Sequence, residues 1–235
     1  MNKKNTNNNK ILIAVIAVLA VILIAVVALI ADSGSSKPSV DNTTTSQSSQ
    51  SGNEEIASTN PQSANTPEPL EITDTERTNV KVEMADGQTF SICVYPDVAP
   101  QSAQNFLNLV REGFYDGLTF HRVIEGFMAQ GGDPEGTGMG GSDRNIVGEF
   151  SANGHENTLS HKRGVVSMAR SNDFNSASSQ FFICYDDASF LDGQYAAFGE
   201  VTEGMEVVDT FLSAGTDEND KPLKDVVIAK MTVVE

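Results

Sequence analysis

One segment of the sequence, FHRVIEGFMAQGGD at residues 120–133, gathers side chains that could do chemistry together. Within nine residues it places a cation, Arg122, two large apolar side chains, Phe127 and Met128, and the amide of Gln130. A guanidinium is always charged and holds its donors in a rigid arrangement. The segment is therefore suited to donating hydrogen bonds to a substrate group that rests against an apolar surface. The paired glycines at its end predict a tight backbone turn.

Three further stretches are unlike ordinary scaffolding. They are the glycine-rich stretch 136–141, the pair VSMAR at 166–170 and SSQFFI at 178–183, and FLDG at 190–193, with Tyr195 and an FG pair soon after. Stretch 136–141 formally matches the nucleotide-binding pattern G-x-G-x-x-G, but no strand–helix–strand unit surrounds it. We therefore predict a rim loop there and no nucleotide site.

Short strands must position these stretches. Alternating apolar and polar residues predict strands at 80–84 and 90–94, and Asp86-Gly87 between them is typical of a hairpin turn. Further short apolar runs predict strands at Val165–Met168, Gln180–Cys184, Ala196–Val201 and Val226–Val234.

Two helices are predicted beside the strands. The first begins at Pro100 and ends near Gly113, because its apolar residues are spaced as on one helical face. The second is expected over Gly204–Leu212. Many short strands with only two helices favour an antiparallel barrel over a doubly wound parallel sheet.

In this order and spacing the four stretches resemble the cyclophilin family of peptidyl-prolyl cis–trans isomerases. The pieces FHRVIEGFMAQGGD, SSQFFI, FLDG and FG carry the resemblance, which runs over nearly all of residues 78–235. It implies a mainly β fold, a closed eight-stranded antiparallel β-barrel capped by two α-helices. It also implies an enzyme that needs no cofactor, and we see no Cys/His cluster with metal-ligand spacing.

The resemblance also implies roles for individual residues. Arg122 matches the catalytic arginine, and Gln130 matches the glutamine that orders the peptide and the arginine. Three positions, Arg170, Phe190 and Tyr195, depart from many eukaryotic members, which have asparagine, tryptophan and histidine there. The residues that the resemblance places at the substrate are Phe127, Met128, Gly136, Ala169, Arg170, Gln180, Phe182, Phe190, Leu191 and Tyr195.

The expected chemistry is rotation about an X–Pro peptide bond, whose barrier is ~18–20 kcal/mol. No bond is made or broken, so a donor to the twisted imide nitrogen and an apolar pocket for the ring suffice. Since no proton moves, we interpret His121 as structural, and His155 and His161 as ordinary loop residues. We see no Ser/His/Asp arrangement for a hydrolase. The alternative function is a proline-peptide-binding or chaperone module with little turnover.

The N-terminus is predicted to be an anchor. Residues 11–31 are 21 consecutive apolar positions without a charge, proline or glycine. As a helix they would span roughly 31 Å, about the thickness of a bilayer's hydrocarbon core. Lysines before the span and Asp32 after it predict a cytoplasmic tail at 1–10 and an extracytoplasmic domain in a single-pass cell-membrane protein. The alternative is a signal sequence and a secreted protein.

The rest of the chain divides into a linker and one domain. Residues 32–77 are rich in Ser, Thr, Asn and Gln and are predicted to be a disordered linker. Residues 78–235 have a mixed composition that suffices for one core, so we expect a single, monomeric isomerase domain. Its expected partners are unfolded or partly folded polypeptides that contain proline.

The charge of the domain narrows its partners. Residues 78–235 hold 10 basic and 24 acidic side chains, a formal charge of −14. This charge argues against nucleic acid and against an anionic lipid surface as ligands. The chain has two cysteines, Cys93 and Cys184, each inside an apolar strand pattern. A disulfide between them is possible in an exterior compartment, but small packed side chains are the favoured interpretation.

Overall fold

The computed structural model of the protein describes residues 66–234. The predicted tail, the apolar span and most of the predicted linker lie outside these residues. Within residues 66–234 no helix is long and apolar enough to cross a membrane.

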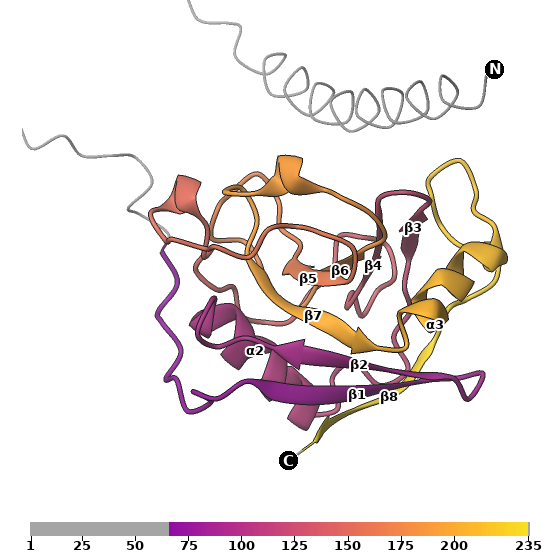
Figure 1. Ribbon diagram of the computed structural model, residues 1–235, viewed down its shortest axis with the longest axis horizontal. Helices are drawn as coiled ribbons and strands as arrows, with labels where there is room; N and C mark the ends of the chain where they lie inside the picture. The colour runs from indigo at the N-terminus through magenta and orange to yellow at the C-terminus, as the bar shows by residue number, and fades with distance from the viewer. Residues whose placement is uncertain (1–65, 235) are drawn as a thin grey trace, which may run out of the picture. The chain divides into compact units, whose positions relative to one another are not determined.

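The described strands form one eight-stranded antiparallel sheet, in the order β3-β4-β6-β5-β7-β2-β1-β8. Figure 1 shows that this sheet curls around an interior. The strands are β1 (Thr78–Met84), β2 (Thr89–Val94), β3 (Arg122–Ile124), β4 (Met128–Gly131), β5 (Val165–Met168), β6 (Phe181–Cys184), β7 (Ala197–Glu203) and β8 (Ile228–Val234).

The two edge strands of the sheet are β3 and β8, and the segments that precede them are hydrogen-bonded to each other. The backbone N–H of Phe120 donates to the carbonyl of Val226 at 2.9 Å, and that of Ile228 donates to Leu118 at 2.8 Å. The curl therefore brings the segment before β3 against the segment before β8. The eight antiparallel strands that the resemblance implied are confirmed for the described residues.

Two α-helices, α2 (Pro100–Arg111) and α3 (Met205–Thr210), pack on the sheet within the described region. Both were predicted from the sequence. α2 contacts β7 and β8, whereas α3 contacts β2, and the strands separate the two helices in Figure 1. Three short 3₁₀ helices, η2 (Ser151–Asn153), η3 (Ser189–Leu191) and η4 (Phe211–Ala214), complete the elements of residues 66–234.

The N-terminus of α2 is capped by a residue from outside the helix. Ala99, at the N-cap, makes no side-chain hydrogen bond. The buried carboxylate of Glu149 takes this role: it accepts the backbone N–H groups of Gln101 and Ser102, each at 2.8 Å. These are two of the donors that a helix leaves without an internal partner.

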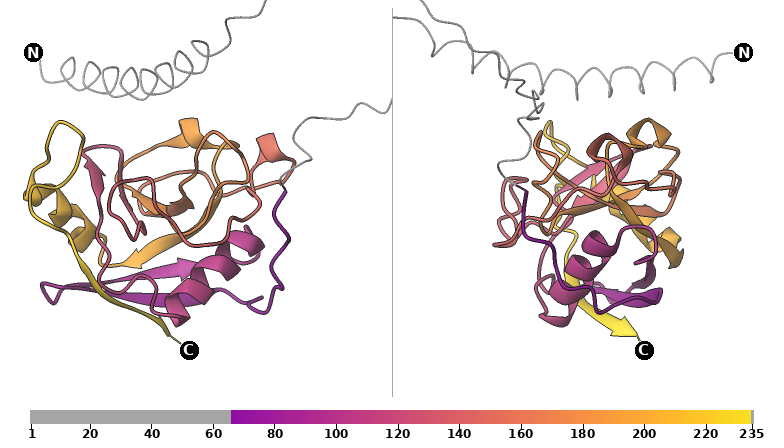
Figure 2. Two further views of the ribbon diagram at one scale, coloured as in Figure 1. Left: turned by 180° about the vertical axis from the view of Figure 1, so that it is seen from behind. Right: turned by 90° about the vertical axis from the view of Figure 1, so that its left-hand side faces the viewer.

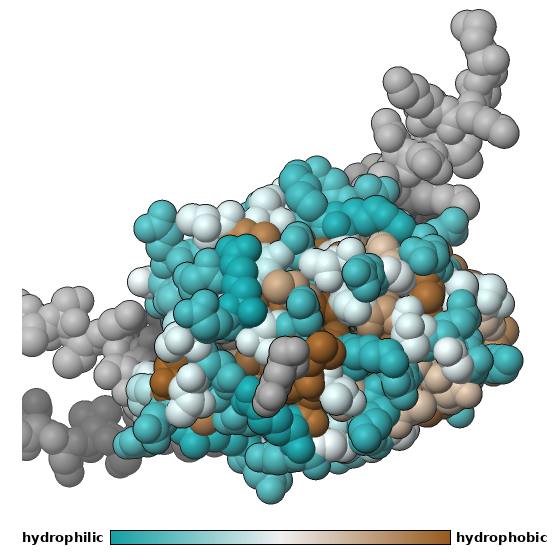
Figure 3. Space-filling model, turned by 60° about the horizontal axis from the view of Figure 1, so that its bottom comes forward, coloured by the Kyte–Doolittle hydropathy of each residue, from teal (hydrophilic) through white to brown (hydrophobic). Residues whose placement is uncertain are grey.

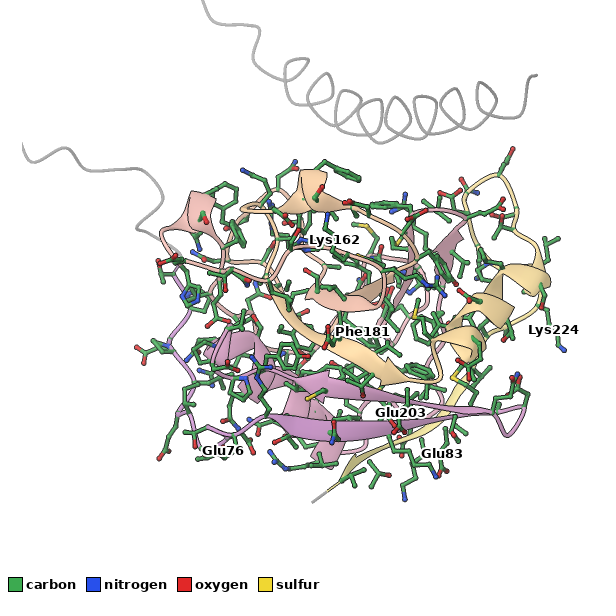
Figure 4. All side chains as sticks on the ribbon, in the orientation of Figure 1. Glu76, Glu83, Lys162, Phe181, Glu203 and Lys224 are labelled. Atoms are coloured by element: carbon green, nitrogen blue, oxygen red, sulfur yellow. The ribbon has the colours of Figure 1, made fainter. Side chains whose placement is uncertain are left out.

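Aromatic rings fill the interior of the curled sheet. The ring centroid of Phe106, on α2, lies 5.3 Å from Tyr115, 5.4 Å from Phe181 and 5.1 Å from Phe198. All four side chains are fully buried. Figure 4 shows Phe181 among the side chains of the interior, whereas Glu76, Glu83 and Lys224 lie at the periphery.

Residues 66–77, which the sequence analysis includes in the linker, lie along α2 as an extended segment (Figure 2). Two glutamines of the helix hold this segment. The backbone N–H of Leu70 donates to Gln101 Oε1 at 2.6 Å, and that of Thr73 donates to Gln104 Oε1 at 2.7 Å. Asp74 forms a salt bridge with an arginine at the end of α2 at 2.6 Å. The ordered region therefore begins before residue 78.

Both cysteines are free. Cys184 is fully buried on β6, and Cys93 is half-buried on β2. This confirms the interpretation of both as packed side chains.

Candidate active site

Strand pairing brings together the two residues that were predicted to be catalytic. Arg122 and Gln130 are direct cross-strand partners on β3 and β4. The turn between these strands uses Gly126 at φ +75°, where only glycine is unstrained. Directly opposite residues point to the same face of a sheet, so the guanidinium and the amide share one side.

The same row continues across the next strands. Gln130 is paired with Phe182 on β6, and Phe182 is paired with Ser167 on β5. Four strands thus present Arg122, Gln130, Phe182 and Ser167 side by side on one face. The glycine turn after β4 makes this pairing possible, because a Cβ on Gly132 would lie 2.4 Å from a backbone oxygen of the segment before β6.

A small apolar cluster lies beside this row. Its buried members are Met128, Phe182, Cys184 and Ala188. The resemblance implies a proline pocket with walls of Phe127, Met128, Phe182 and Leu191, and Phe127 and Leu191 pack against this cluster. Ala169 and Tyr195, which were predicted elsewhere along the substrate, pack against it as well. The structure therefore brings the predicted pocket residues into one cluster, separate from the main core.

Phe190 lies at the exposed edge of this cluster. Its side chain is 63% exposed, and its ring centroid is 5.6 Å from that of Phe127. Phe190 therefore adds exposed apolar surface at the edge of the cluster.

Hydrogen bonds between two glutamines connect the row to the glycine-rich stretch. Gln130 Nε2 donates to Gln180 Oε1 at 2.8 Å. Gln180 Nε2 donates in turn to the carbonyls of Gly138 at 3.1 Å and Gly140 at 2.7 Å. The stretch 136–141 is therefore a loop beside the site, as predicted.

Buried Asp133 organises the beginning of this loop. Its carboxylate accepts the backbone N–H groups of Glu135, Thr137 and Gly138. Burial alone raises the pKa of Asp133, but these bonds outweigh burial and hold the pKa below its usual value. Gly136, a predicted substrate residue, has φ +62° within this turn.

The side chain of Arg170 folds back on the protein. Its guanidinium donates to the carbonyl of Gln194 at 2.8 and 3.1 Å, and it lies 4.6 Å from the ring centroid of Tyr195. Burial lowers the pKa of Arg170, although an arginine remains charged at neutral pH. This position supplies a cation braced against the wall of the pocket.

Arg122 itself is partly open to solvent. Its side chain is 35% exposed, and its Nε lies 3.5 Å from Asp220 Oδ2. Asp220 belongs to the loop between η4 and β8 and was not singled out from the sequence. A single aspartate in an acidic loop has no pattern that would have revealed this contact.

The comparisons with known proteins agree with this geometry. The family model described as cyclophilin type peptidyl-prolyl cis-trans isomerase/CLD matches residues 79–233. The chain belongs to this family. It is therefore a peptidyl-prolyl cis–trans isomerase.

Several peptidyl-prolyl cis–trans isomerases are similar in sequence or structure. The chain is 43% identical over 141 residues to an isomerase of Arabidopsis thaliana, covering 60% of this chain and 86% of the relative. It is 45% identical over 123 residues to isomerase B of Bacillus subtilis, covering 52% and 82%. A crystal structure of a Cryptosporidium parvum cyclophilin superimposes with a TM-score of 0.62 at 31% identity, covering 68% and 99%.

A buried Ser/His/Asp cluster in this cyclophilin differs from what was predicted. From the sequence no such arrangement was expected, and His161 was interpreted as an ordinary loop residue. His161 is buried, with Nδ1 2.8 Å from Asp192 Oδ1 and Nε2 3.0 Å from Ser167 Oγ. Ser167 has no exposed surface, so a substrate cannot reach its hydroxyl. The imidazole stacks on Phe182 with centroids 6.0 Å apart. The cluster therefore supports the pocket from behind.

His121 is buried next to Arg122 in the chain. Within residues 66–234, neither of its ring nitrogens has a hydrogen-bond partner. Burial lowers the pKa of His121, which keeps the imidazole neutral. These surroundings suit the structural role that was predicted for it.

Proposed function

We propose that this cyclophilin catalyses X–Pro isomerisation by donation from Arg122 to the imide nitrogen, while the apolar cluster around Phe182 holds the proline ring. The observation that carries this proposal is the cross-strand row that sets Arg122 and Gln130 beside Phe182. When the peptide bond twists, its nitrogen loses resonance and regains a lone pair. A positioned guanidinium then binds the transition state more strongly than the planar ground state.

The size of the required effect is consistent with this arrangement. Uncatalysed X–Pro exchange takes tens to hundreds of seconds. Raising it to an ordinary turnover of about 10–10³ s⁻¹ needs roughly 4–7 kcal/mol. One well-placed charged donor contributes about 3–4 kcal/mol, and holding the ring while the acyl side rotates supplies the remainder.

The other site residues have supporting roles in this proposal. Gln130 and Gln180 orient the peptide, because their amides are fixed to each other and to the loop 136–141. Met128, Phe127 and Leu191 enclose the ring with Phe182. Phe190 and Tyr195 lie where residues next to the proline would rest, with Ala169 and Arg170 along the backbone of the peptide.

The proposed clients are secreted or surface proteins that fold just outside the membrane. Residues 11–31 would anchor the protein, with the N-terminus cytoplasmic, and the linker would hold the domain clear of the bilayer. Protease added to intact cells should remove the catalytic domain, and the residual fragment should stay with the membrane after carbonate extraction. Release of intact protein into the medium would instead support signal cleavage.

The experiment that tests the mechanism compares Arg122→Ala and Arg122→Lys with the parent on a short Ala-Pro peptide. We expect Arg122→Ala to lower kcat/KM by about two to three decades, since one transition-state donor is lost. The lysine variant keeps a charge without the rigid fork and should fall in between. Full activity of Arg122→Ala would contradict the mechanism. Tight peptide binding by a parent without turnover would support the alternative of a binding module.

A further inference from the structure

The loop between η4 and β8 is bound to the strand that carries Arg122. The backbone N–H of Val123 donates to the carbonyl of Asp220 at 2.9 Å. In Figures 1 and 2 this yellow loop lies beside β3. This hydrogen bond places Asp220 beside β3, and its carboxylate reaches the guanidinium of Arg122.

The loop is ordered by its own hydrogen bonds. Asp217 Oδ1 accepts the backbone N–H groups of Asn219 at 2.8 Å and Lys221 at 3.0 Å, and the backbone N–H of Asp217 donates to the carbonyl of Lys221 at 2.9 Å. The backbone N–H of Asp220 donates to the carbonyl of Asp217 at 3.2 Å. This framework fixes the position of Asp220 independently of Arg122.

Asp220 has a backbone conformation that other side chains rarely adopt. Its φ is +63°, and within residues 66–234 no other residue except glycine has a positive φ. Aspartate and asparagine tolerate this left-handed region better than most residues. The turn at Asp220 aims the carboxylate at β3.

The contact is made at one end of the guanidinium. Asp220 Oδ2 lies 3.5 Å from Nε of Arg122, and no other carboxylate of the described residues lies within 4.0 Å of this side chain. An ion pair on Nε leaves both terminal nitrogens available. Both side chains are partly exposed, at 35% and 42%, so the pair contributes little to folding stability.

We propose that Asp220 is a positioning residue: it fixes the rotation of the Arg122 guanidinium so that the terminal nitrogens face the imide of the bound proline. This inference rests on the proposed role of Arg122. A partly exposed arginine without a partner samples many rotamers, and catalysis needs one of them. The fixed loop therefore contributes to catalysis without touching the substrate.

The test uses the full-length chain in mild detergent and the variant Asp220→Asn. Asparagine keeps the size and the tolerance of positive φ, so the loop is preserved, but it removes the charge. We expect kcat to fall about threefold to fivefold, because a partly exposed ion pair biases the arginine rotamers by about that factor and displaced catalytic groups lose orientation. KM should stay within about twofold, since the apolar cluster that binds the ring is unchanged. The matched control is Glu218→Gln, which removes an exposed charge from the same loop and should keep the parental kcat.

A double variant separates positioning from a general structural role. In an Arg122→Ala background, Asp220→Asn should cause no further loss, because the group that it positions is absent. The ¹⁵Nε signal of Arg122 should also shift in Asp220→Asn and stay unchanged in Glu218→Gln.

Each outcome has a defined meaning. A parental or raised kcat in Asp220→Asn, while Arg122→Ala shows its expected loss, overturns this inference and leaves the proposed function standing. An equal loss in both backgrounds overturns it as well, because Asp220 would then act on the fold. Full activity of Arg122→Ala overturns the arginine mechanism and this inference together.

Discussion

The two buried histidines, His121 and His161, have opposite surroundings with the same consequence for charge. His161 has a partner on each ring nitrogen, whereas His121 has none within residues 66–234. Burial lowers the pKa of both, and for His161 it outweighs the attraction of Asp192. Both imidazoles are therefore neutral in the folded protein at neutral pH.

This makes stability depend on pH in a predictable direction. The unfolded chain binds protons at these histidines near pH 6.5, where the folded protein does not. The free energy of unfolding should therefore fall as the pH drops below about 6.5, by up to about 1.4 kcal/mol per pH unit for each histidine. The stability that the neutral form contributes is complete above pH 6.5 and is lost as the pH falls toward the folded pKa.

The variant His121→Phe tests this pH dependence for His121. Since no partner is lost, the variant should keep most of its stability at pH 7.5, and its decline between pH 7 and 5.5 in urea denaturation should be shallower than the parent's. The remaining decline in this pH range belongs to His161, because the carboxyl groups titrate below it. A slope equal to the parent's would show that His121 titrates in the folded protein as it does in the unfolded chain.

Which residues gather at the candidate site could be predicted from the sequence where those residues lie inside a long motif. Arg122, Gln130 and Phe182 come from such motifs, and strand register brings them together. Asp220 and the Ser167–His161–Asp192 cluster could not be predicted, because each depends on how distant loops pack. A short acidic loop and a lone histidine look the same in sequence whether they are bound or free.

At the scale of elements, alternation and apolar runs predicted six of the eight described strands, and periodicity predicted both helices. These patterns did not reveal β3 and β4. β5 and β6 are as short as β4, but they are mostly apolar runs, whereas β3 and β4 include Arg122 and Gln130 and form no such run. Residues 66–77 were assigned to the linker because their composition is polar. The structure binds them through Gln101 and Gln104 of α2, a contact that composition cannot show.

The cap of α2 supplies a prediction at this scale. Glu149→Gln should lower the free energy of unfolding by about 2–3 kcal/mol, because one carboxylate oxygen that accepts N–H groups becomes an NH₂ facing them. Urea denaturation measures the change, and Glu156→Gln, at an exposed position, is the matched control. A Glu149→Gln midpoint equal to that of the control would mean that solvent replaces the cap.

At the scale of the whole molecule, the net charge of the domain is negative, whereas the arginines of the candidate site are positive. Residues 78–235 carry a formal charge of −14, while the site holds two arginines, Arg122 and Arg170. The face in Figure 3 is largely hydrophilic with separate hydrophobic areas. A charged residue next to the substrate proline therefore meets local cations, whereas one farther along the chain meets the field of the domain.

This difference predicts a salt-dependent preference among substrates. Peptides with Lys or Glu placed four residues from an Ala-Pro unit put the charge about 13 Å away, beyond direct contact with the pocket. At low salt kcat/KM should be higher for the Lys peptide, because the negative domain attracts it, and the ratio should approach one near 0.5 M salt as the field is screened. A Ser peptide should show no salt dependence. Equal rates for the Lys and Glu peptides at low salt would mean that the local arginines cancel the field of the domain at the site. A Lys preference that persists at high salt would instead point to a direct contact.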